Sequence, residues 1–213
     1  MDLQIALDRI PLARAVELTS AVAPYVDWIE VGTSLVKQFG AKGLVAVVEA
    51  AGPTPVLADL KTVDDAVFEL SLAYDCGARS ATVLGLAPDV TIDAAVRHAA
   101  SLDRELVIDL MGLTTSRTTA LAARLPHPVV LAPHVSKDAQ LPGQIAADLL
   151  GPWATGRKLA MAGGLTARDL PALRTVPDLR VIIGSAVTRS ADPVASVLEL
   201  RQAAGKEHGP DER

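Results

Sequence analysis

Short apolar runs alternate with amphipathic helical segments along almost the whole chain. Eight runs rich in Val, Ile, Leu and Ala cover residues 3–8, 25–31, 55–59, 81–84, 105–109, 129–131, 158–162 and 180–183. Helical spacing of apolar residues follows each run, over residues 11–22, 43–51, 64–76, 90–101, a weaker stretch after 116, 139–150, a stretch from 167, and 193–203. The runs are mostly apolar throughout, which is typical of parallel strands covered on both sides.

Eight strand–helix units in one series predict the fold class. They indicate an α/β protein with a (β/α)8 TIM barrel, and a doubly wound open sheet is the alternative. No shift in composition and no linker interrupts the series, so we expect one barrel domain over residues 1–205. Residues 206–213 are polar and predict a frayed C-terminal tail.

Composition excludes several classes of function. The chain has 213 residues, a formal net charge of −5 and a pI of about 5.3, which argue against a general affinity for nucleic acid or anionic membranes. The first residues lack a charged leader followed by an apolar segment, and apolar stretches stop well short of membrane-spanning length. The single cysteine, Cys76, cannot form an internal disulfide. We expect a soluble cytoplasmic protein.

Polar residues gather where the predicted strands end. In a barrel of this kind the active site lies at the carboxyl ends of the strands. Four carboxylates, one lysine and one histidine stand at matching ends of different strands: Asp8, Glu30, Asp59, Lys61, Asp109 and His134. Residues two apart on a strand share a side, so Asp59 and Lys61 are expected to project together. A structural ion pair would explain those two alone, but the convergence of the whole set favours a catalytic site.

These groups suit chemistry on an anionic intermediate. Asp59 and Glu30 offer the hard oxygen ligands that Mg²⁺ prefers, and the alternative is that both carboxylates only hold Lys61 in place. Neighbouring anions should keep Lys61 protonated, so it is a better proton donor or electrostatic stabiliser than a Schiff-base former. His134 can move a proton near neutral pH.

Two glycine loops follow the seventh and eighth runs. Gly163-Gly164 and Gly184-Ser185 stand where barrels commonly bind a phosphate through backbone N–H groups and a helix N-terminus. Glycine also serves tight turns, so the placement after both of these strands, rather than the residue type, favours phosphate binding. No Walker-type or dinucleotide-binding glycine pattern is present.

With these residues in view, the chain resembles the orotidine 5′-phosphate decarboxylase superfamily. The resemblance rests on Asp59-x-Lys61-x-x-Asp64, on Asp8 and Glu30 before it, and on the two glycine loops after it, and it covers nearly the whole chain. It is nearest to the branch of 3-hexulose-6-phosphate synthases and 3-keto-L-gulonate-6-phosphate decarboxylases. That branch implies Mg²⁺, a 1,2-enediolate formed from a ketose phosphate, and a homodimer in which Asp64 reaches into the partner's site.

Smaller features separate the two members of this branch. Asp109 and the absence of an arginine directly after Gly184 resemble the synthases, whereas the segment from His134 to Gln140 resembles the decarboxylases, with Lys137 in place of an arginine. We therefore expect a carbon–carbon lyase of the synthase type, with catalytic residues Lys61, Asp64, Asp109 and His134. Asp8, Lys137, Gly163, Gly164, Gly184 and Ser185 are expected to bind the substrate.

Three alternatives stay open from the sequence. The first is the decarboxylase. The second is a non-catalytic barrel that binds a sugar phosphate, which loss of a metal or proton-transfer residue would favour. The third is an isomerase or epimerase of ketose phosphates, which would require two opposed acid–base groups about the reacting carbon.

Overall fold

Eight parallel strands close into one barrel with sequential order β1 to β8, in agreement with the predicted fold class. In the computed structural model, which describes residues 1–139 and 146–206, the strands are β1 (Asp2–Leu7), β2 (Trp28–Val31), β3 (Val56–Thr62), β4 (Ser80–Leu84), β5 (Glu105–Asp109), β6 (Val130–Ala132), β7 (Leu159–Ala162) and β8 (Leu179–Ile183). β8 pairs with β1, so the sheet has no free edge.

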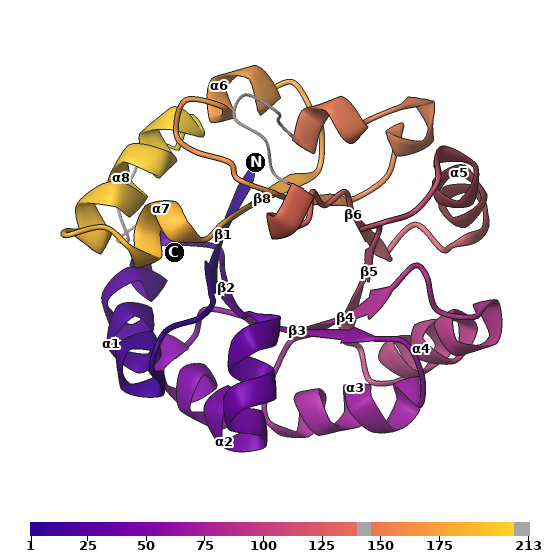
Figure 1. Cartoon of the computed structure of the whole chain (residues 1–213), viewed down its shortest axis with the longest axis horizontal. Helices are drawn as coiled ribbons and strands as arrows, with labels where there is room; N and C mark the ends of the chain where they lie inside the picture. Colours follow the sequence, from indigo (N-terminus) through magenta and orange to yellow (C-terminus); the bar gives the residue numbers. More distant parts are fainter. Residues whose placement is uncertain (140–145, 207–213) are drawn as a thin grey trace.

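Helices surround the barrel on the outside, as Figure 1 shows from above its strands. The α-helices are α1 (Leu12–Val22), α2 (Thr33–Ala51), α3 (Ala66–Asp75), α4 (Asp89–Ser101), α5 (Thr115–Arg124), α6 (Leu170–Leu173), α7 (Ser185–Thr188) and α8 (Pro193–Ala203). Within the described residues, four short 3-10 helices join them, namely η1 (Ala23–Tyr25), η2 (Lys137–Ala139), η3 (Ala146–Leu149) and η4 (Pro152–Ala154).

Most predicted boundaries agree with the structure to within a few residues, and two helices differ more. α2 begins at Thr33, ten residues before the predicted start, and contains a kink at Gly40, where φ is 56°. The two glycines Gly40 and Gly43 obscured the helical pattern on their amino-terminal side. Of the predicted helix 139–150, residues 140–145 lie outside the described residues and Ala146–Leu149 forms a 3-10 helix. The predicted tail at 206–213 also lies outside them, apart from Lys206.

The apolar residues form two separate cores. The larger one lies between the strands and the helices and includes Ile5, Ile29, Val83, Ile108 and Val181, all fully buried. The smaller one fills the inside of the barrel and consists of Leu57, Val107, Val130, Ala132 and Ala160, with Trp28 and Ile182 packed against it. Because side chains alternate along a strand, β3, β5, β6 and β7 contribute buried residues to both cores.

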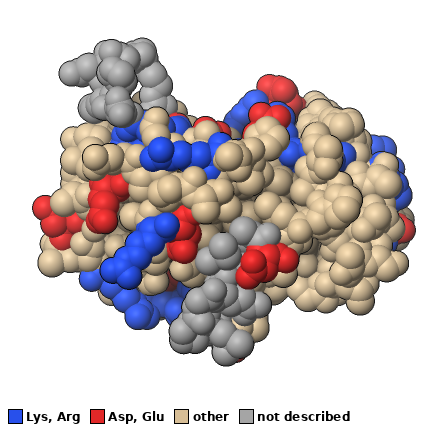
Figure 2. Space-filling view, turned by 90° about the horizontal axis from the view of Figure 1, so that it is seen from above, with Lys and Arg blue, Asp and Glu red and all other residues tan. Residues whose placement is uncertain are grey.

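The remaining surface shows no dominant charge on the face drawn in Figure 2, where Lys and Arg side chains lie among Asp and Glu side chains. Among the described residues, no helix combines the length and the apolar character needed to span a bilayer.

Candidate active site at the carboxyl ends of the strands

β3 brings its two charged residues to the centre of the site. The strand extends to Thr62, three residues beyond the predicted end, and its pairing with β4 shifts register between Ala58 and Thr62. Lys61 lies at this irregularity with φ of 52°, an uncommon left-handed value for a residue with a side chain. Its backbone N–H donates to Oγ1 of Thr82 at 2.9 Å, which helps to hold the bend. The expected meeting of Asp59 and Lys61 therefore occurs, on a bent strand end.

Asp59 is surrounded by donors. Its carboxylate accepts from Lys61 Nζ at 2.9 and 3.1 Å, from Thr33 Oγ1 at 2.6 Å and from Thr82 Oγ1 at 2.8 Å, and the residue is only 6% exposed. The three donors come from β3, β4 and the start of α2. These bonds satisfy a buried carboxylate that would otherwise be costly.

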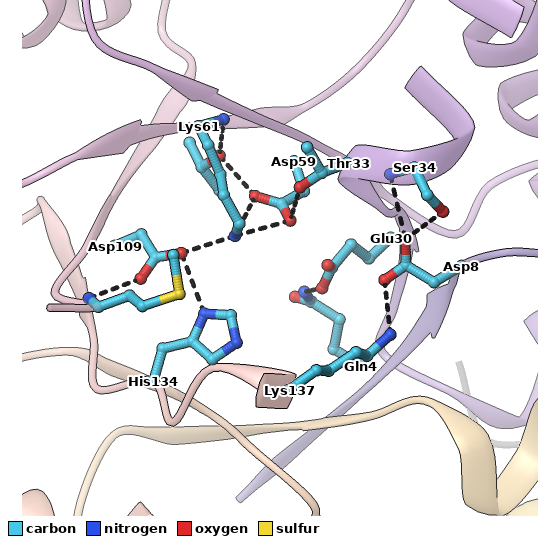
Figure 3. A network of polar contacts seen from close by, with 12 residues as sticks. Gln4, Asp8, Glu30, Thr33, Ser34, Asp59, Lys61, Asp109, His134 and Lys137 are labelled. Carbon is cyan, nitrogen blue, oxygen red and sulfur yellow. Dashed lines mark hydrogen bonds and ion pairs between the residues drawn. The ribbon is translucent and has the colours of Figure 1, made fainter. Parts of the chain in front are cut away.

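Asp109, the last residue of β5, joins Lys61 to His134 (Figure 3). One oxygen, Oδ2, lies 2.7 Å from Lys61 Nζ and 3.1 Å from His134 Nδ1, and Oδ1 accepts from the backbone N–H of Met111 at 2.9 Å. Burial alone would raise the pKa of Asp109, but the hydrogen bond from His134 and the charge of Lys61 outweigh it and lower this pKa to about 2. Asp109 is therefore an anion at neutral pH.

Lys61 lies between two anions. Burial alone would lower the pKa of its ammonium group, but the charges of Asp59 and Asp109 together with hydrogen bonds to both raise it well above the ordinary value. The amine is thus held as a cation, which agrees with the sequence-based expectation and argues against Schiff-base chemistry.

Glu30 lies near the carboxyl end of β2 and points to the inside of the barrel. Of the buried carboxylates in the site, it has the fewest hydrogen-bond donors and no ion pair among the described residues. It is 6% exposed, and Nε2 of Gln4 donates to its Oε2 at 2.5 Å. Burial, and next the charge of Asp59, raise the pKa of Glu30 to about 8. Glu30 is therefore largely protonated at neutral pH, and a divalent cation held by Glu30 and Asp59 would favour its carboxylate form.

The donor set fits Mg²⁺ in particular. Within the described residues, no group of three or more His, Cys, Asp or Glu side chains could hold a metal by itself. Mg²⁺ usually keeps several waters and is bound by one or two carboxylates together with substrate oxygens, so two hard oxygen donors suffice for it. Zinc would require a more complete protein ligand set.

Asp8 lies on the β1 side of the site. Its Oδ1 accepts from Ser34 Oγ at 2.6 Å and from the Ser34 backbone N–H at 3.2 Å, and its Oδ2 lies 3.4 Å from Lys137 Nζ. A side chain at Gly32 would collide with the Asp8 carboxylate, so the glycine allows this close approach. Lys137, half exposed on η2, crosses the mouth of the barrel to make the contact.

The two glycine loops lie next to each other, because β7 pairs with β8 in the barrel. Gly163 and Gly164 have φ values of 126° and 70°, which favour glycine, and a Cβ at Gly163 would lie 3.0 Å from that of Val135. Gly184 precedes α7, which begins with the exposed Ser185. The role of the four residues in phosphate binding stays a prediction.

Asp64 is not brought into this site. The residue is exposed in the turn between β3 and α3, and its Oδ1 accepts from the backbone N–H of Asp65 at 2.8 Å. Its predicted contribution thus depends on a second subunit.

Sequence reasoning missed four residues that contact the predicted carboxylates, namely Gln4, Thr33, Ser34 and Thr82. Gln4 and Thr82 interrupt apolar strands, and an uncharged polar residue at a buried strand position is the signal that could have identified them. Thr33 and Ser34 follow Gly32 at the start of α2, which the sequence placed in a loop.

Comparison with known proteins first identifies the protein family. Residues 1–200 match the family described as orotidine 5′-phosphate decarboxylase / HUMPS family, and the chain belongs to this family. The predicted superfamily is thereby confirmed.

Individual relatives indicate which members of this family the chain resembles. The 3-hexulose-6-phosphate synthase of Mycobacterium gastri is 36% identical over 208 residues, covering 95% of this chain and 99% of the relative. The crystal structure of 3-hexulose-6-phosphate synthase from Salmonella typhimurium has a TM-score of 0.88 at 32% identity, covering 98% of this chain and all of that chain. The structure of 3-keto-L-gulonate-6-phosphate decarboxylase from Vibrio cholerae has a TM-score of 0.83 at 28% identity, covering 96% and 97% of the two chains.

Proposed function

We propose that the protein is a 3-hexulose-6-phosphate synthase, an aldehyde-lyase that adds formaldehyde to ribulose 5-phosphate and catalyses the reverse cleavage. Full-length similarity to synthases of that name supports this activity. The structural observation that carries the proposal is the continuous chain His134–Asp109–Lys61–Asp59 at the carboxyl ends of the strands, with Glu30 beside it (Figure 3). These contacts connect His134, which can move a proton, with the fixed ammonium group of Lys61 and with the carboxylates of Asp109 and Asp59.

His134 moves the proton in the proposed reaction. Because ionised Asp109 accepts from Nδ1–H, a neutral His134 has its lone pair on Nε2, where it can take a proton from C1 of the ketose phosphate. The carbon left behind is part of a 1,2-enediolate, and it forms the new bond to the carbon of formaldehyde. The former aldehyde oxygen gains the negative charge, and it receives the proton from His134 Nε2.

Lys61 stabilises the negative charge of the enediolate. Its ammonium group is fixed by Asp59 and Asp109 before the substrate arrives, so little reorganisation is needed when charge develops on the substrate oxygens. We assign Glu30 and Asp59 as ligands of Mg²⁺, which when bound would act as a Lewis acid toward the two vicinal substrate oxygens.

The phosphate of the substrate is assigned to the loops after β7 and β8, and Gly184 offers the cleaner test of the two. Its φ is −111°, and an added Cβ would meet only the Ala6 carbonyl oxygen, at 3.7 Å, so Gly184→Ala should fold. We expect Gly184→Val to raise KM about 10- to 100-fold with little change in kcat, since a hydrogen bond to a charged group contributes about 1.5–3 kcal/mol. Gly184→Ala should have a smaller effect in the same direction.

Steady-state kinetics and the affinity for inorganic phosphate measure both effects. Unchanged affinity for inorganic phosphate in Gly184→Val would place the phosphate elsewhere.

A homodimer with shared sites is the proposed assembly. Exposed apolar residues lie on the β3–α3 segment that contains Asp64 and on the β4–α4 segment, and we call them the α3–α4 apolar patch: Val63, Val67, Phe68, Leu86 and Val90. Phe68 is 65% exposed and Val90 is 72% exposed. α3 packs against α4, and exposed apolar side chains on neighbouring segments are typical of a binding surface. A twofold axis near the patch would bring Asp64 to the partner's site.

The decarboxylase is the second candidate, because the segment from His134 to Gln140 resembles that branch and Lys137, which stands in place of its arginine, contacts Asp8 at the mouth of the site. An activity screen with Mg²⁺ separates the two by testing formaldehyde plus ribulose 5-phosphate beside 3-keto-L-gulonate 6-phosphate. We expect rapid aldol addition and slow or no release of carbon dioxide. Rapid decarboxylation without aldol activity would overturn the assignment, and binding of both sugar phosphates without turnover would support a non-catalytic barrel.

A further inference from the structure

A chain of buried polar side chains crosses the inside of the barrel from its amino-terminal end to Glu30. Arg180 donates to both carboxylate oxygens of Glu105, at 2.9 and 2.8 Å, and to Oε1 of Gln4 at 3.3 Å. Gln4 in turn donates from Nε2 to Oε2 of Glu30 at 2.5 Å, at the opposite end of the interior (Figure 3). Gln4 is fully buried and Arg180 is 7% exposed.

The fold fixes the position of Arg180. Its guanidinium lies 3.9 Å from the centroid of the Trp28 ring, and the two-point contact with Glu105 sets the plane of the group. Gln4 pairs in register with Trp28 on one side and with Ile182 on the other, so β1 carries it between the two strands that bear Glu30 and Arg180.

The hydrogen-bonding capacity of arginine determines how the Gln4 amide is oriented. A guanidinium has donors and no acceptor, so only the amide oxygen can face Arg180. The NH2 group must then face Glu30 and donate to it. The reverse orientation would place two donors together at Arg180 and an amide oxygen against the Glu30 carboxylate.

We propose that Arg180 is a positioning residue: held by Glu105 and Trp28, it fixes the Gln4 amide and thereby orients the Glu30 carboxylate for the divalent cation. The inference rests on the proposed Mg²⁺ site. Outer hydrogen-bond partners of metal ligands commonly contribute 10- to 100-fold to metal affinity, because they restrict the ligand to its binding orientation. A purely structural role, in which the Arg180–Glu105 pair only closes the base of the barrel, would affect stability alone.

The test measures cation affinity in the absence of substrate. Mn²⁺ serves as the probe, and its dissociation constant is obtained by electron paramagnetic resonance for the full chain. The variants are Gln4→Leu, which roughly conserves volume, and Arg180→Met combined with Glu105→Gln, which removes the ion pair without leaving a buried charge unpaired. Arg157→Met is the matched control, because Arg157 is 5% exposed and donates to the carbonyls of Leu125, Pro126 and Val129, away from Glu30.

We expect both Gln4→Leu and the double variant to raise the dissociation constant of Mn²⁺ about 10- to 100-fold. Arg157→Met should leave it within about twofold of wild type even though its melting temperature falls, because its lost hydrogen bonds do not touch the ligands. Arg180→Lys, which keeps a donor, should give an intermediate value. If the double variant does not fold, Gln4→Leu and Arg180→Lys carry the test.

Failure of the positioning role and failure of the metal site itself would give different results. Wild-type affinity for Mn²⁺ in Gln4→Leu, together with loss of affinity in Glu30→Gln, would overturn the positioning role and leave the metal site intact. Absence of Mn²⁺ binding by wild type, or wild-type affinity in Glu30→Gln, would overturn the metal site itself and with it this inference.

Discussion

Removal of divalent cations with excess EDTA is expected to lower turnover at least about a thousandfold, and added Mg²⁺ should restore it. Burial, and next the charge of Asp59, raise the pKa of Glu30 to about 8, so Glu30 is largely protonated at neutral pH without a cation, and a bound cation would stabilise its carboxylate beside Asp59. A metal that polarises substrate oxygens contributes several kcal/mol to the stability of the transition state, and about 4 kcal/mol corresponds to a thousandfold in rate. Steady-state assays before and after readdition measure the effect.

A matched pair of variants controls this experiment. Glu30→Gln should increase the Mg²⁺ concentration needed for half-maximal activity, whereas Glu49→Gln, on the exposed side of α2, should behave as wild type. Full activity of the wild-type protein in excess EDTA would exclude the metal from the mechanism.

Mixing two nearly inactive variants is expected to restore about a quarter of wild-type activity. Asp64→Asn removes the carboxylate predicted to reach the partner's site, and Lys61→Ala removes the cation between Asp59 and Asp109. A mixed dimer contains one site with both residues intact and one site that lacks both. Random exchange makes about half of the dimers mixed, so about one site in four is complete.

The result is interpretable only after exchange is shown, for example by copurification of differently tagged subunits. Lys158→Ala in place of Lys61→Ala is the control, because Lys158 is exposed at the start of β7, far from the strand ends that carry the site. In the mixture of Asp64→Asn with Lys158→Ala every site retains Lys61, so the activity should depend only on how many sites receive an intact Asp64. Complete exchange without recovery in the Lys61→Ala mixture would show that Asp64 acts within its own barrel or has no role.

Much of the candidate site could be predicted because its residues end strands. Asp59, Lys61, Asp109 and His134 follow apolar runs, and a barrel brings all strand ends to one face. The partners that complete them could not be assigned from sequence. Thr82 and Gln4 lie within strands, and which carboxylate each would meet depends on the stagger of neighbouring strands, which one chain's pattern does not specify.

The irregular end of β3 shows the same limit of prediction from sequence. Period-two spacing predicts that Asp59 and Lys61 share a side, and their side chains do meet. The left-handed backbone at Lys61 and its bond to Thr82 depend on β4, which is distant in sequence. A local pattern cannot predict a backbone conformation that a neighbouring strand imposes.

The sequence by itself determined the number and order of the strands, the barrel class, and the acids, lysine and histidine that gather at the strand ends, but it did not predict α7. These follow from hydrophobic periodicity and from the cost of burying charge without partners. Only the tertiary structure decided that Asp109 shares one oxygen between Lys61 and His134, and that Arg180 reaches Glu30 through Gln4. Such contacts join residues up to 176 positions apart, and closure of the barrel, rather than any local preference, sets their distances.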